Sequence, residues 1–159
     1  MAFKNVIGSR RASWRVIQSI ADSETDESRT KTLDEYRTVI ETEIETICDE
    51  ILDIINGLVR NSEDTEPKVF YLKMKGDYLR YLAEFQTGPK KETSSNQANE
   101  AYAQADQFAT GDSGLPPTDP IRLGLALNVS LNIYTHQCFF ISLFVDVVNR
   151  IIYVKKNNF

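Results

Sequence analysis

The longest regular pattern in this sequence is helical and covers residues 32–59. Apolar side chains recur there every three or four positions, with acidic residues on the opposite face, as in an amphipathic helix that buries one stripe. Glycine and proline, which interrupt helices, are scarce in the whole chain (7 and 5 of 159 residues), and the long segments are rich in Glu, Leu, Ile, Lys and Arg. The sequence therefore predicts an all-α protein with one domain's worth of chain.

Further helices are expected on both sides of this one. Pro67 opens a helix, because proline is favoured in a first turn. Later in the chain, Asp119 as N-cap and Pro120 as first residue begin another. The sequence predicts about five helices, at about residues 1–20, 32–59, 67–85, 97–108 and from 120 on, with polar loops at 22–26, 88–96 and 111–119.

Two groups of basic residues each line one face of an expected helix. Lys4, Arg11 and Arg15 are spaced so that at 3.6 residues per turn they return to within about 20° of one direction. Lys73 lies two turns before Arg80 and shares its face. For each residue alone, a solvated basic face is the simpler interpretation. As a set in a chain of net charge −5, these repelling cations are best explained by an external dianion such as phosphate.

Three segments of the sequence resemble the 14-3-3 family, in the family's order and at its separations, and a fourth is similar to another family helix. The resemblance covers roughly residues 2–130. It implies a dimeric, antiparallel all-helical adaptor that binds phosphoserine or phosphothreonine peptides of signalling proteins in an amphipathic groove. The three segments are KNVIGSRRASWR, FYLKMKGDYLRYLAE and LPPTDPIRLGLALN, and the fourth is YRTVIETEIETICDEIL.

The resemblance also implies which residues bind the phosphopeptide. Matched position by position, Lys73 and Asn128 correspond to residues that contact the bound peptide's backbone. Asp77, four residues after Lys73, either forms an ion pair with it, which we favour, or orients a cation of the clamp. The phosphate clamp falls on Arg11, Arg15, Arg80 and Tyr81, with Lys4 beside it.

Ser13 is a candidate regulatory phosphosite. Arg10-Arg11-Ala12-Ser13 resembles a basophilic kinase site, and the corresponding serine of the family lies at the dimer interface. The alternative, which we favour, is a small helix residue that packs against a neighbour.

Both ends of the sequence depart from the family pattern. The chain starts where the family already has preceding helices, which supply much of its dimer interface, so this interface is expected to be incomplete. Near residue 130 the resemblance stops, and an apolar segment without a family counterpart follows. We expect a partial domain over residues 1–130 and a divergent tail over 131–159 that continues the last helix. The abrupt change favours an alternative exon, a retained intron or a gene-prediction error over a functional tail.

Several functional classes find no support in the sequence. A net charge of −5 disfavours nucleic acid as a partner, and no membrane span, secretory signal, metal-ligand spacing, cofactor motif or catalytic constellation is visible. The one histidine, His136, lies in the divergent tail. Cys48 falls in a buried stripe, and the two cysteines suit a reducing, cytoplasmic compartment. We therefore expect a phosphopeptide-binding adaptor, not an enzyme, with phosphorylated clients. The alternative is a non-binding structural fragment or splice product of a 14-3-3 gene.

Overall fold

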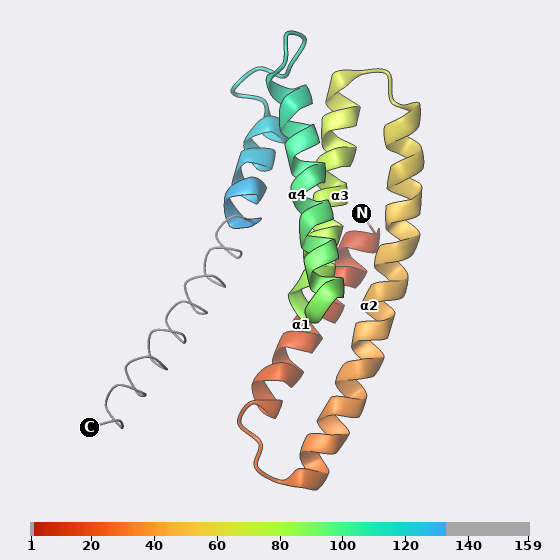
Figure 1. Ribbon diagram of the computed structural model, residues 1–159, viewed down its shortest axis with the longest axis vertical. Coiled ribbons are helices and arrows are strands. Elements are labelled where there is room, and N and C mark those ends of the chain that lie inside the picture. Colours follow the sequence, from red (N-terminus) through yellow and green to blue (C-terminus); the bar gives the residue numbers. More distant parts are fainter. Residues whose placement is uncertain (1, 133–159) are drawn as a thin grey trace, which may run out of the picture.

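The computed structural model describes residues 2–132, which fold into antiparallel helices (Figure 1). The longest helix, α2, runs the length of the molecule. α1 packs beside its first half, α3 packs against α2, and α4 packs against α3. A further helical segment, residues 120–132, lies beside α4 and reaches the last described residue. This arrangement confirms the predicted all-α array of about five helices. The bounds are α1 Ala2–Ala21, α2 Glu27–Asn61, α3 Thr65–Phe85 and α4 Gly88–Thr110.

The start of α4 corrects the sequence prediction. Residues 88–96 were expected to form a loop, but α4 begins at Gly88, with Pro89 in its first turn. Ser94 and Ser95 are buried, and the Ser94 hydroxyl donates to Gln86 Oε1 at 2.6 Å. This polar run is therefore a helix whose small side chains face the protein interior, and a pattern of apolar residues could not reveal it.

α2 and α3 also begin earlier than predicted. α2 starts at Glu27, because the Asp26 carboxylate accepts a hydrogen bond from the backbone N–H of Arg29 at 3.0 Å and so caps the helix. α3 starts at Thr65, one residue after Asp64 and just before the predicted Pro67. The predicted loop over residues 22–26 is confirmed as the connection between α1 and α2.

The cap of the last helical segment is confirmed. Asp119 Oδ1 accepts from the backbone N–H groups of Ile121 and Arg122, at 2.8 and 3.2 Å. The Arg122 guanidinium donates to the Leu115 carbonyl at 2.6 Å and holds the connector against the helix. The predicted continuation through the tail lies, from residue 133 on, outside the described residues, as does His136.

The described residues form two apolar clusters. Cys48 is fully buried in the first cluster, which confirms its prediction as a small hydrophobic residue, and burial raises the pKa of its thiol to about 12. The first cluster joins α1, α2 and α3 through Ile7, Ile17, Ile40, Ile44, Cys48, Ile51, Ile55, Tyr78 and Leu82. The second joins α3, α4, the connector and the last segment through Val69, Leu72, Leu79, Ala98, Tyr102, Ala105, Ala109, Leu115 and Leu125.

Trp14 connects three helices beside the first cluster. Its indole Nε1 donates to Glu41 Oε1 on α2 at 2.8 Å. Its ring meets the Phe85 ring at the end of α3 in a tilted arrangement, with centroids 6.4 Å apart. The polar edge and the apolar face of one side chain thus hold α1 against both neighbours.

Within residues 2–132 no helix is both long and apolar enough to cross a membrane. No group of three or more His, Cys, Asp and Glu side chains in this part of the chain could hold a metal ion.

Candidate anion-binding site

Three arginines from two helices converge on one carboxylate, that of Glu84 on α3. Arg11 of α1 donates from Nε to Glu84 Oε2 at 2.9 Å and pairs with the other oxygen through a terminal nitrogen. Arg15, one turn later on α1, reaches Oε2 at 3.3 Å. Arg80, one turn before Glu84, lies 3.7 Å from Oε1. Three guanidiniums and one carboxylate carry a net charge of +2 in a chain of net charge −5.

The Tyr81 ring lies under two of these cations, those of Arg11 and Arg80. The guanidinium carbon of Arg11 lies 3.8 Å from the Tyr81 ring centroid and that of Arg80 lies 5.0 Å from it, both within cation–π range. The Tyr78 ring meets Tyr81 edge-on, with centroids 5.8 Å apart, and fixes its position. Burial, with the nearby charge of Asp77, raises the pKa of Tyr81. Its phenol therefore stays protonated at neutral pH and remains a hydrogen-bond donor.

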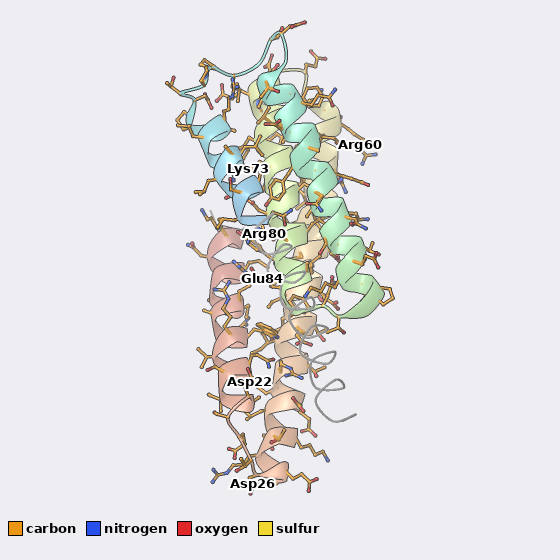
Figure 2. All side chains as sticks on the ribbon, turned by 60° about the vertical axis from the view of Figure 1, so that its left-hand side comes forward. Asp22, Asp26, Arg60, Lys73, Arg80 and Glu84 are labelled. Carbon is orange, nitrogen blue, oxygen red and sulfur yellow. The ribbon has the colours of Figure 1, made fainter. Side chains whose placement is uncertain are left out.

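A second polar group, centred on Asp77 of α3, lies along the same helix. Asp77 Oδ2 pairs with Lys73 Nζ at 3.0 Å, so the favoured ion pair is confirmed. Asp77 Oδ1 accepts from the hydroxyl of Tyr102 on α4 at 2.7 Å and from Asn128 Nδ2 on the last segment at 2.6 Å. One carboxylate thus positions side chains from three helices. Figure 2 shows Lys73, Arg80 and Glu84 in this order along α3.

Tyr102 joins the two groups. Its hydroxyl oxygen lies 3.5 Å from Arg80 Nε while its proton goes to Asp77. Burial, reinforced by Asp77, raises the pKa of Tyr102. Burial alone would lower the pKa of Arg80, but the Tyr102 hydrogen bond and neighbouring negative groups raise it overall, so this guanidinium stays charged. Arg80 and the Asp77 group therefore belong to one hydrogen-bonded network.

Sequence reasoning missed Glu84 and Tyr102. The available signal for Glu84 was its place four residues after Arg80, on the same helix face. The signal for Tyr102 was Gly76 inside a helical pattern, because a side chain at Gly76 would lie 2.6 Å from the Tyr102 ring. Neither signal identifies its partner without the packing of the helices.

The remaining predicted site residues lie on the exposed side of α1. Lys4 is exposed and forms no ion pair with any other described residue. Ser13 is also exposed, and its hydroxyl donates to the Ser9 carbonyl in the same helix at 3.1 Å. Its neighbour Arg10 pairs with Glu43 of α2 at 2.7 Å. A phosphosite at Ser13 stays a prediction.

Comparison with known proteins places this sequence in a family. The family described as 14-3-3 protein matches residues 1–138. The chain is 54% identical over 135 residues to a 14-3-3-like protein of Fucus vesiculosus, covering 84% of this chain and 53% of that protein. It is 50% identical over 138 residues to the checkpoint signal transducer rad24 of Schizosaccharomyces pombe, covering 84% and 50%. It is 49% identical over 142 residues to the protein BMH2 of Saccharomyces cerevisiae, covering 86% and 51%.

The chain spans about half the length of the curated relatives it matches. The domain boundary expected near residue 130 stays a prediction. The motifs, the antiparallel helices and the match over residues 1–138 agree, and the chain belongs to the 14-3-3 family.

Proposed function

We propose that this chain binds phosphoserine or phosphothreonine peptides and acts as a non-enzymatic adaptor for phosphorylated clients. The observation that carries the proposal is the convergence of Arg11, Arg15 and Arg80, from helices far apart in the sequence, on one carboxylate beside the Tyr81 ring. Packing alone does not favour three guanidiniums at one point. Their net charge of +2 together with Glu84 matches the nearly −2 charge of a phosphate monoester at neutral pH.

The donor chemistry suits a phosphate group. Guanidinium forks form bidentate, charge-assisted hydrogen bonds with phosphate oxygens, and each such bond contributes about 1.5–3 kcal/mol when well placed. The protonated phenol of Tyr81 adds a further donor at the same point. Arg11 and Arg80 have side chains only 17% exposed, so a phosphate held by them would be screened by salt less than at an open surface.

The last helical segment offers groups for the rest of a peptide. Asn128 gives an N–H to Asp77, which leaves its amide oxygen to accept from a peptide backbone N–H. Lys73 is held near it by the same carboxylate. An exposed apolar stripe with the spacing of a helix face continues along this segment, which gives an extended peptide apolar contacts next to polar ones. The stripe consists of Leu123, Leu127 and Leu131.

Dimerisation and a cytoplasmic location belong to the same proposal, because both follow from family membership. The alternative function, a structural fragment without ligand affinity, is decided by the binding experiment below.

The test compares a phosphoserine peptide with its unphosphorylated twin by calorimetry on the full chain. We expect binding of the phosphopeptide only, and a loss of about tenfold or more in affinity for Arg80→Ala, the equivalent of one charge-assisted bond. Arg60→Ala is the matched control, because Arg60 lies on α2, is exposed and donates only within its own helix, to the Asn56 carbonyl at 3.1 Å. Figure 2 shows Arg60 far from Arg80.

Equal affinity for the two peptides would refute phosphate recognition, and no detectable binding of either would favour the structural fragment. An equal loss in Arg80→Ala and Arg60→Ala would show that net charge, not the clamp, attracts the peptide. Circular dichroism of both variants separates a lost contact from a lost fold.

A further inference from the structure

We propose that Glu84 is an internal counter-anion that stabilises the empty site and opposes ligand binding there. The inference rests on the proposed function. The Glu84 carboxylate lies where a ligand anion would lie: it accepts a hydrogen bond from Arg11 Nε and also pairs with Arg15 and Arg80. Among the described residues, no other carboxylate pairs with any of these three arginines.

The empty site needs such an anion. Without it, three guanidiniums would face one another across the α1–α3 gap, two of them with side chains only 17% exposed. Like charges that are partly removed from water repel strongly, because solvent screens them less. Glu84, itself 26% exposed, also provides the ion pairs that join α1 to α3 at this level. Its charge should therefore stabilise the unliganded fold.

The same charge should weaken binding. A phosphate that approaches these guanidiniums either displaces Glu84 from the arginine N–H groups or remains beside the like charge of its carboxylate. Both cases cost free energy, and the cost rises with the ligand's negative charge. Monoanions, which gain less from the arginines, should be held too weakly to detect. Glu84 would thus keep the site from filling with ordinary anions, at the expense of some phosphopeptide affinity.

The decisive variant is Glu84→Gln, which keeps the size of the side chain and an acceptor for Arg11 but removes the charge. We expect opposite changes in two quantities. The urea midpoint of the empty chain falls, while the affinity for a phosphoserine peptide rises about five- to tenfold at low salt, with a smaller gain at high salt. The variant also gains measurable affinity for a sulfoserine peptide of the same sequence, a monoanion of similar shape.

Two further variants serve as controls. Glu43→Gln removes a carboxylate paired with Arg10, the residue next to Arg11, at 2.7 Å and so makes the same charge change outside the site. We expect it to leave the peptide affinity within about twofold. Glu84→Asp keeps the charge, and we expect no gain in sulfoserine binding. A destabilised Glu84→Gln chain is measured through its urea midpoint against peptide concentration, because a ligand at free concentration c that binds only the folded chain stabilises it by RT ln(1 + c/Kd), from which Kd is obtained.

The outcomes separate the two proposals. If the parent binds the phosphopeptide and Glu84→Gln binds it equally or more weakly, Glu84 serves to orient the arginines and the counter-anion inference is wrong. If Glu43→Gln gives the same gain, the effect is one of overall charge and the inference is also wrong. If the parent prefers neither anionic peptide over the unmodified one, the proposed function itself fails and this inference fails with it.

Discussion

The packing of Tyr102 against Gly76 allows a sharp test of how the site is built. A Cβ added at Gly76 would lie 2.6, 2.7 and 2.8 Å from three carbons of the Tyr102 ring, distances that require a shift. The ring has little room to move, because Tyr102 is 2% exposed and its hydroxyl is fixed to Asp77 at 2.7 Å. We therefore expect Gly76→Ala to destabilise the fold, although alanine is the better helix former.

The magnitude follows from three contributions. Overpacking a filled core costs about 1–3 kcal/mol. Loss of the hydrogen bond from Tyr102 to a charged acceptor adds about 1.5–3 kcal/mol if the ring is displaced. Replacing a helical glycine by alanine returns about 1 kcal/mol. If the ring is displaced, the net expectation for Gly76→Ala is a destabilisation of about 1.5–5 kcal/mol, and Asp77 and Asn128 lose the support of the Tyr102 hydroxyl.

Gly57→Ala is the matched control. Gly57 also lies inside a long helix, but no atom lies within 4 Å of its added Cβ. This substitution should stabilise the chain by about 0.5–1 kcal/mol through helix propensity alone. Urea unfolding followed by far-ultraviolet circular dichroism compares the two. If Gly76→Ala is as stable as Gly57→Ala, the close packing of the Tyr102 ring on α3 does not hold the site together.

Three other predictions concern caps, pH and the candidate phosphosite. Asp119→Ala should lower stability by about 1 kcal/mol in urea unfolding, because it removes the cap bonds at 2.8 and 3.2 Å, whereas Asp112→Ala in the exposed connector should be neutral. Burial raises the pKa of the Cys48 thiol from 9.0 to about 12. The neutral thiol therefore contributes fully to the free energy of unfolding below pH 9, and this contribution is lost as the pH rises from 9 towards 12, because the unfolded chain releases the proton first. Unfolding free energy should therefore fall by about 1.4 kcal/mol less in Cys48→Ala than in the parent between pH 8 and 10, and equal slopes would contradict this. Ser13→Glu adds a charge to an exposed face of α1 and should weaken self-association in sedimentation about tenfold relative to Ser13→Ala, whereas equal association would argue against a switch.

The sequence predicted the helices better than their ends, for a physical reason. Apolar periodicity shows a helix that buries large side chains, and α2 is of this kind. The first part of α4 instead buries Ser94 and Ser95. Serine is small and polar, and runs of such residues are also typical of loops. Whether such a run forms a helix or a loop depends on its packing, here that of α4 against α3.

The site shows the same division. Spacing alone placed Arg11 and Arg15 on one stripe and Arg80 on another, because helical geometry fixes the direction of each side chain. That the two stripes face each other depends on how α1 and α3 lie against α2, which no local pattern contains. For this reason no local pattern identifies Glu84, which lies between the stripes, as the partner of the arginines.

Trp14 gives the chain an optical reporter. It is the only tryptophan of the 159 residues, so excitation at the red edge of the absorption band selects a single indole. That indole touches Phe85, the residue next to Glu84, and hydrogen-bonds to α2. Its emission wavelength and lifetime therefore record whether α1 is seated against α3, at the level where the arginines meet. Occupancy of the site and release of α1 can therefore be followed in the unlabelled protein, because the whole tryptophan signal comes from this one residue.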